Sequence, residues 1–140
     1  MPIDITEFAD AVNSGLADGT PNVLVTVGAD GSPDIGLKGS MMVFDKDHLA
    51  YWERTLGGHF SNLKQSVKVA VNYFNRDRRQ YLRFFGEATV HDEGSMRQEI
   101  MRRTIPVELD RDPERRGVGV LIEVTKVIDA FGRRTLTRDD

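Results

Sequence analysis

The sequence contains no cysteine among its 140 residues. This excludes disulfides, thiolate zinc sites, iron–sulfur clusters and cysteine nucleophiles, so any redox chemistry has to come from a bound cofactor. The chain also lacks an apolar run near the roughly 18 residues of a membrane span. Its N-terminus, Met-Pro-Ile-Asp, has neither a basic nor a hydrophobic leader region. We therefore expect a cytoplasmic protein without membrane contact.

The chain also lacks a large excess of charge of either sign, since 19 basic and 22 acidic side chains leave a net charge of −3. No basic stripe is interleaved with aromatic residues, so we expect no nucleic-acid partner. No serine lies in an elbow motif with histidine and aspartate partners, so hydrolysis has no support. His48 falls in a predicted turn and His91 at a strand end, without ligand spacing to other donors, so we expect no metal site.

Apolar residues make up 39% of the chain and charged residues 29%, which is typical of a globular protein. The mass of 15.8 kDa predicts a folded surface of roughly 7,300 Å². That is enough for one core and too little for two ordinary domains, so residues 1–140 are predicted to form a single domain.

The spacing of apolar residues predicts a mainly β fold with added helices (α+β). Asp4 and Glu7 are spaced as a capping box, as are Ser95 and Gln98. Gly86 indicates a bulge within a long strand. The predicted helices cover 5–18, about 59–66 and a stretch from Ser95 to before Pro106; the predicted strands cover 23–27, a run through 38, 40–44, 49–54, 67–74, 79–91 and 118–131; residues 108–116 are predicted to form a charged surface loop. Six or seven antiparallel strands with two or three helices favour a closed or partly closed barrel.

The junction Trp52-Glu53-Arg54-Thr55-Leu56-Gly57-Gly58 leads from a strand into a helix. Two glycines allow close backbone approach, and a helix N-terminus presents free N–H groups, so the junction has the parts of an anion site. Strand alternation places Trp52 and Arg54 on one side and Glu53 on the other, which makes Arg54 the better phosphate ligand. The alternative interpretation is an ordinary turn with a surface arginine.

A second cluster, Gly36-Leu37-Lys38-Gly39-Ser40-Met41-Met42, surrounds a lysine with small residues. Glycines in a strand leave backbone groups accessible to a flat ligand, and Lys38 can place a charge near an anionic group. The alternative is a β-bulge in which Met41 and Met42 fill the core.

In their order along the chain, these pieces resemble the FMN-binding split-barrel superfamily, the pyridoxamine 5'-phosphate oxidase-like proteins. The matching pieces are Leu24-Val25-Thr26-Val27, Asp30-Gly31-Ser32-Pro33, Tyr51-Trp52-Glu53-Arg54, Asn62-Leu63, Val67-Lys68-Val69-Ala70-Val71 and Phe85-Gly86-Glu87-Ala88. The resemblance implies a homodimeric split barrel with FMN in a groove between two protomers, the flavin ring along 38–42 and the phosphate at the end of the strand 49–54 and the start of the next helix. It implies the cofactor-binding residues Lys38, Gly39, Ser40, Met41, Met42, Trp52, Glu53, Arg54, Thr55, His59, Phe60 and Asn62.

Two positions depart from the family pattern. Gly58-His59 stands where the family has a basic pair, and a histidine is mostly neutral at pH 7. Near its C-terminal end the chain reads Phe131-Gly132-Arg133-Arg134-Thr135-Leu136, without the tryptophan and basic grip of the vitamin B6 oxidases. The resemblance thus implies an FMN-dependent oxidoreductase acting on a small organic substrate other than vitamin B6. The alternatives are a deazaflavin-dependent reductase on the same fold and a non-catalytic flavin or haem binder.

Overall fold

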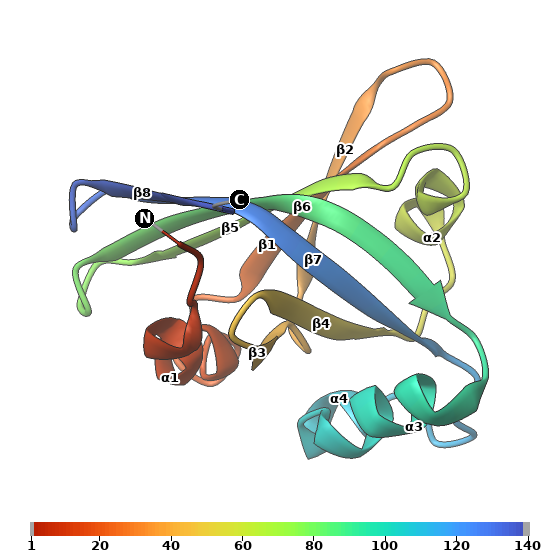
Figure 1. The fold of residues 1–140 in the computed structure, drawn as a ribbon. Coiled ribbons are helices and arrows are strands. Elements are labelled where there is room, and N and C mark those ends of the chain that lie inside the picture. The colour runs from red at the N-terminus through yellow and green to blue at the C-terminus, as the bar shows by residue number, and fades with distance from the viewer. Residues whose placement is uncertain (1, 139–140) are drawn as a thin grey trace.

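The computed structural model describes residues 2–138. Within them the chain folds into eight antiparallel strands, four α-helices and one short 3-10 helix (Figure 1). The helices are η1 (Thr6–Phe8), α1 (Ala9–Asn13), α2 (Gly58–Leu63), α3 (Gly94–Arg103) and α4 (Pro106–Leu109); the strands are β1 (Asn22–Val27), β2 (Pro33–Lys38), β3 (Met42–Asp45), β4 (His48–Glu53), β5 (Lys68–Asn75), β6 (Gln80–His91), β7 (Val118–Asp129) and β8 (Arg134–Thr137). The predicted α+β fold class is confirmed.

The strands follow the order β2-β1-β5-β6-β7-β4-β3, and β8 pairs with β7. β2 and β3 stand at the two ends of this order, and no pairing joins them within residues 2–138. The barrel is therefore split rather than closed. The β1–β2 hairpin projects from the body of the sheet, while α3 and α4 lie together beyond the end of β4 (Figure 1).

The predicted bulge at Gly86 is confirmed. The register between β6 and β7 shifts between Phe85 and Gly86. A Cβ atom at Gly86 would stand 2.2 Å from the carbonyl oxygen of Glu123, so only glycine allows the two backbones to approach this closely. The shift lets two twelve-residue strands bend together across the sheet.

The apolar side chains divide into two cores. The larger one fills the barrel and includes Leu24, Tyr51 and Phe84, with η1 and α1 covering one end. A smaller one lies between α3 and the outer face of β3 and β4, where Trp52 and Met42 pack on Ile100. Alternate residues of β4 thus face different cores. The accessible surface of 7583 Å² is close to that expected for a single folded domain of this mass.

The first predicted helix, 5–18, is wrong in length, because helical structure covers only Thr6–Phe8 and Ala9–Asn13. The chain turns back at Gly15, where a Cβ would stand 2.8 Å from the carbonyl oxygen of Thr20. Asn13 is the last residue of α1, and its Oδ1 accepts the backbone N–H of Val43 at 2.7 Å. The predicted caps are absent too: the N-caps are Ile5 and, for α3, Glu93, neither with a side-chain cap bond.

Two elements were not predicted. β8 follows a tight turn in which Asp129 accepts the N–H of Gly132 and Arg133 adopts a φ of 53°. α4 lies where a surface loop was predicted, and both Glu108 and Asp112 of that segment are buried. No helix within residues 2–138 is long and apolar enough to cross a membrane.

Candidate functional site

A cavity of about 230 Å³ lies where β2 and β4 end and α4 approaches them. It brings together six of the predicted cofactor residues, Lys38, Gly39, Trp52, Glu53, Arg54 and Thr55. Its remaining lining residues are Leu16, Pro21, Leu37, Glu108 and Arg111. The two sequence clusters that indicated an anion site and a small-residue strand therefore meet at one place.

Glu53 lies at the end of β4 with its side chain only 1% exposed. Its Oε1 accepts a hydrogen bond from Lys38 Nζ at 2.8 Å. Its Oε2 accepts the backbone N–H of Thr55 at 3.1 Å, the Thr55 hydroxyl at 2.9 Å and the N–H of Leu56 at 3.2 Å. Leu56 has a φ of 52°, a left-handed conformation that few side chains adopt. The junction thus folds into a turn in which a carboxylate of the chain itself accepts the Thr55 and Leu56 donors, and binding of an external anion there stays a prediction.

The charge of Glu53 follows from these contacts. Burial raises the pKa of Glu53, but the Lys38 ammonium group and the Thr55 and Leu56 donors outweigh burial and hold the pKa below its ordinary value of 4.5. Glu53 is therefore ionised at neutral pH. Lys38 is 13% exposed and forms its ion pair with this carboxylate.

Arg54 follows the last residue of β4 and lines the same cavity as Glu53. Its Nε lies 3.6 Å from Glu108 Oε1, beyond ordinary hydrogen-bond length, and the Arg54 side chain is 30% exposed. The Arg111 side chain is exposed and forms no hydrogen bond or ion pair with any residue in the described range 2–138, while its backbone N–H donates to the Glu108 carbonyl oxygen at 3.2 Å. Arg54 and Arg111 are accordingly the cationic groups of the cavity that are most accessible to an external anion.

Trp52 is held in the core rather than in the cavity opening. Its indole Nε1 donates to Asp112 Oδ2 at 2.9 Å, and the Arg97 guanidinium lies 4.9 Å from its ring centroid. Asp112 also accepts the N–H groups of Arg116 and Gly117. Burial raises the pKa of Asp112, but these three donors outweigh it and lower the pKa below its usual value. Trp52 thus anchors the 112–117 loop to β4.

The segment predicted to carry a flavin ring is not one continuous strand. β2 ends at Lys38 and β3 begins at Met42, with a turn closed by the Met41 N–H on the Lys38 carbonyl oxygen. Ser40 is buried, and its hydroxyl bonds both the carbonyl oxygen and the N–H of Trp52. Met41 fills the barrel core and Met42 the smaller core. Of this segment, Lys38 and Gly39 line the cavity.

The α2 residues lie apart from the cavity. His59 Nδ1 is 2.7 Å from Thr26 Oγ1, and Asn62 Nδ2 donates to the same oxygen at 2.9 Å. The Thr26 hydroxyl thus links Asn62 to His59, whose Nε2 lies 4.0 Å from Asp34 Oδ2. Burial lowers the pKa of His59 below 6.5. A neutral His59 therefore joins α2 to β1.

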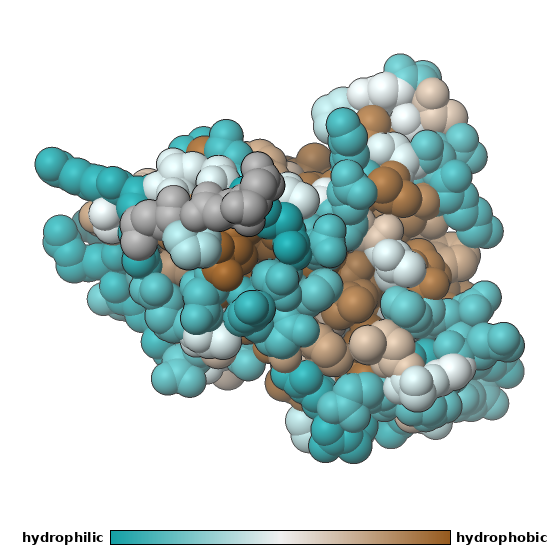
Figure 2. All heavy atoms as spheres, viewed as in Figure 1, coloured by the Kyte–Doolittle hydropathy of each residue, from teal (hydrophilic) through white to brown (hydrophobic). Residues whose placement is uncertain are grey.

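Phe60 faces a third region, a hollow of about 380 Å³ between α2 and the end of β6. Its lining includes Leu63, Val67, Ala88 and Val90. Figure 2 shows apolar surface gathered between α2 and the α3–α4 pair, on the face where this hollow opens. The twelve predicted residues thus fall into four groups: six at the cavity, three buried at residues 40–42, two bound to Thr26, and Phe60 at the hollow. Their role in cofactor binding stays a prediction.

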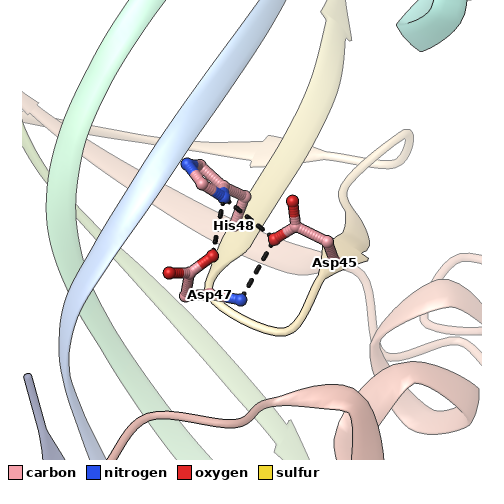
Figure 3. Close-up of side chains that lie close together, drawn as sticks. All are labelled: Asp45, Asp47 and His48. Carbon is pink, nitrogen blue, oxygen red and sulfur yellow. Dashed lines mark hydrogen bonds and ion pairs between the residues drawn. The ribbon is translucent and has the colours of Figure 1, made fainter.

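His48 does have acidic partners, contrary to the expectation from its position in a turn. Its Nδ1 lies 2.8 Å from Asp45 Oδ1 and 2.9 Å from Asp47 Oδ1 (Figure 3). Asp45 Oδ1 also accepts the Asp47 N–H, and Arg138 donates to Asp47 Oδ2 at 3.0 Å. The ligand atoms of these three residues lie close enough together to bind a cation. In the structure, however, the Asp45 and Asp47 carboxylates are already paired with His48, and Asp47 is also paired with Arg138.

Glu108, Arg111 and Asp112 were not predicted as site residues, because the charged segment 108–116 is typical of a solvated surface loop. One signal was present: Pro106 is the first residue of α4, a position where its missing N–H costs nothing. A helix from Pro106 places Glu108 and Arg111 three residues apart on one face. That pair would then have been a candidate for the same site.

A family model described as pyridoxamine 5'-phosphate oxidase matches residues 8–127. Among solved structures, HupZ of Group A Streptococcus is 25% identical with a TM-score of 0.73, covering 95% of this chain and 97% of that chain. A candidate pyridoxamine 5'-phosphate oxidase from Lactobacillus delbrueckii is 29% identical with a TM-score of 0.66, covering 83% and 89%. An FMN-binding protein from Syntrophomonas wolfei is 16% identical with a TM-score of 0.69, covering 89% and 86%. No curated protein sequence matches the chain.

Proposed function

The chain belongs to the pyridoxamine 5'-phosphate oxidase family, and from that premise we propose that it binds FMN and acts as an oxidoreductase on a small organic substrate. The observation that carries this proposal is the cavity at the end of β4, which is lined by Arg54, with its Nε 3.6 Å from Glu108 Oε1, and by the exposed Arg111. Two guanidinium groups match the doubly charged terminal phosphate of FMN.

The donor set fits FMN with one exception. Arg54 and Arg111 would hold the phosphate, and Gly39 keeps the backbone close to the cavity wall, since a Cβ there would stand 2.9 Å from Glu108 Oε2. The exception is Glu53, whose charge repels a phosphate. FMN would supply the exchange of electrons or hydride, while the protein supplies position and electrostatic environment. No side chain of this site is assigned as a general acid.

We also propose that the protein is a homodimer that completes the site. The cavity of about 230 Å³ is below the roughly 300–1,000 Å³ of typical small-molecule sites. β2 ends the strand order as an edge strand, and its Ile35 and Leu37 are 69% and 65% exposed. An apolar edge needs cover, and a two-fold pair is the commonest way to supply it.

Vitamin B6 is not the proposed substrate. Trp52 is the only tryptophan of the chain and is buried against Ile100, so it cannot contribute to a substrate grip at the C-terminal end. β8 uses Arg134 in ion pairs with Glu7 and Asp129. The substrate is thus a small organic molecule of another kind.

An absorbance spectrum tests the proposal. The protein is purified without added cofactor, then supplemented with FMN and desalted before the spectrum is recorded. We expect a flavin spectrum at close to one FMN per protomer. A deazaflavin band instead of a flavin band would favour the reductase alternative, and a Soret band would favour a haem binder. A protein that retains none of these cofactors contradicts the proposal.

A further inference from the structure

We propose that Glu53 sets how much more tightly this cavity binds a flavin with a phosphate than a flavin without one. Its carboxylate occupies the donors that the phosphate would otherwise use. The inference rests on the proposed function, since it concerns the cofactor end that enters the cavity. It makes Glu53 a specificity-determining residue of the cofactor site and leaves Lys38, which the sequence indicated as a charge near an anionic group, paired with Glu53.

The geometry of the donors carries the inference. One ammonium group, one hydroxyl and two backbone N–H groups converge on Glu53 at 2.8 to 3.2 Å. This is the donor set expected for a bound phosphate, with a left-handed residue at Leu56 that turns its N–H inward. The Glu53 carboxylate therefore satisfies an anion site from inside the chain.

Displacing Glu53 is not an easy route to free these donors. The side chain is 1% exposed and lies at the end of a strand fully paired with β7. Moving its charge would leave Lys38 without its counter-ion in a site that is 13% exposed. An incoming phosphate thus meets the turn with its donors already used.

The charge balance of the cavity leads to the same conclusion. Its charged lining residues are three cations, Lys38, Arg54 and Arg111, and two anions, Glu53 and Glu108. Glu53 pairs with the nearest cation, Lys38, and Glu108 lies 3.6 Å from Arg54 Nε, so Arg54 and Arg111 are left to bind the phosphate, with Glu108 as a partial counter-charge. Without the charge of Glu53, Lys38 would add a third charged donor.

Riboflavin differs from FMN only in lacking the phosphate, so the ratio of the two dissociation constants isolates the contribution of the phosphate. In the unmodified protein we expect FMN to bind about tenfold more tightly than riboflavin, through Arg54 and Arg111. Glu53→Gln frees Lys38, and the ratio should rise by about a further tenfold, with riboflavin affinity unchanged. Glu87→Gln, the same substitution at an exposed position of β6, is the matched control and should leave the ratio unchanged.

The double variant Lys38→Gln/Glu53→Gln removes both charges and leaves neither partner unpaired, so it serves even if Glu53→Gln does not fold. If Glu53 neutralises Lys38, the double variant keeps the ratio of the unmodified protein to within about threefold. A tenfold fall in that ratio overturns the inference, since Lys38 would then bind phosphate despite Glu53. An unchanged ratio in a folded Glu53→Gln overturns it as well.

Failure of the proposed function has a separate signature. If neither flavin binds to any variant, the FMN proposal fails, and inorganic phosphate then decides the inference about Glu53. Phosphate binding raises the thermal midpoint, and the inference requires a larger rise for Glu53→Gln than for the unmodified protein or Glu87→Gln. Equal rises in all three contradict it.

Discussion

Replacing Lys38 by methionine removes one partner of the buried ion pair that closes the cavity floor. Glu53 then keeps its charge in a site that is 1% exposed, with only neutral donors around it. Breaking a buried pair in this way costs about 3–5 kcal/mol. Because Lys38 is 13% exposed, we expect the lower end, about 3 kcal/mol. For a chain of this size that corresponds to a fall of about 10 °C in the thermal midpoint at pH 7.

The pH dependence separates this mechanism from simple loss of packing. In the unmodified protein Glu53 has a lowered pKa, so its stabilising contribution is present above about pH 4.5 and is lost as the pH falls. In Lys38→Met burial acts without the ammonium group and raises the pKa of Glu53, so the penalty is largest at neutral pH and shrinks as Glu53 takes up a proton. The gap in midpoint between the two proteins should therefore narrow from pH 7 toward pH 4.

Thermal unfolding followed by circular dichroism at several pH values measures both effects. Lys68→Met is the control, because Lys68 is exposed on β5 and forms no ion pair within residues 2–138. It should change the midpoint by little at any pH. A thermal midpoint of Lys38→Met within about 3 °C of the parent at pH 7, or a difference in midpoint that does not change with pH, would show that the Lys38–Glu53 ion pair does not stabilise the fold as proposed.

Three further substitutions have defined outcomes. Arg54→Ala should weaken FMN binding by about tenfold in fluorescence quenching, since it removes one charged phosphate donor; unchanged affinity would place the phosphate elsewhere. Gly86→Ala puts a Cβ within 2.2 Å of the Glu123 carbonyl oxygen and should lower the free energy of unfolding in urea by about 2 kcal/mol or more; a smaller loss would mean that the bulge relaxes. Asp112→Asn weakens the bond to Trp52 Nε1 and should cost about 1–3 kcal/mol in the same assay at pH 7. Because the pKa of Asp112 in the folded parent lies below its ordinary value of 3.8, this cost should shrink as the pH falls below about 3.8 toward that lowered pKa; equal costs at pH 7 and at low pH would contradict a contribution from the Asp112 charge.

Strand alternation made part of the site predictable. Tyr51 and Trp52 enter different cores, because a period of two fixes the face of each side chain once the strand is identified. The bulge at Gly86 was predictable for a similar reason, as an isolated glycine in a long apolar strand indicates close backbone approach.

The pairing of Lys38 with Glu53 could not be predicted in the same way. The two residues lie on β2 and β4, which are not neighbours in the sheet, and their contact depends on the turn at 39–41. The local sequence indicated the donors of an anion site, but it contained no information on which anion fills them. Glu108 and Arg111 were missed because their positions depend on α4, a four-residue helix too short for a periodic signal.

β8 is too short to be predicted from the sequence. Of its four residues only Leu136 is buried, so there is no alternating pattern to detect, and the strand is defined by its pairing with β7. Likewise, the helical pattern through 5–18 continues past Gly15, where a contact with Thr20 turns the chain. In both places the tertiary contact, and not the local pattern, determines the structure.

Sedimentation velocity of the FMN-supplemented protein, recorded at the protein and the flavin absorption bands together, tests whether the protein binds FMN as a homodimer. We expect one species of about 32 kDa, twice the chain mass of 15.8 kDa, that carries the flavin signal at one FMN per protomer. A species near 16 kDa, or a flavin signal that sediments apart from the protein, would contradict it.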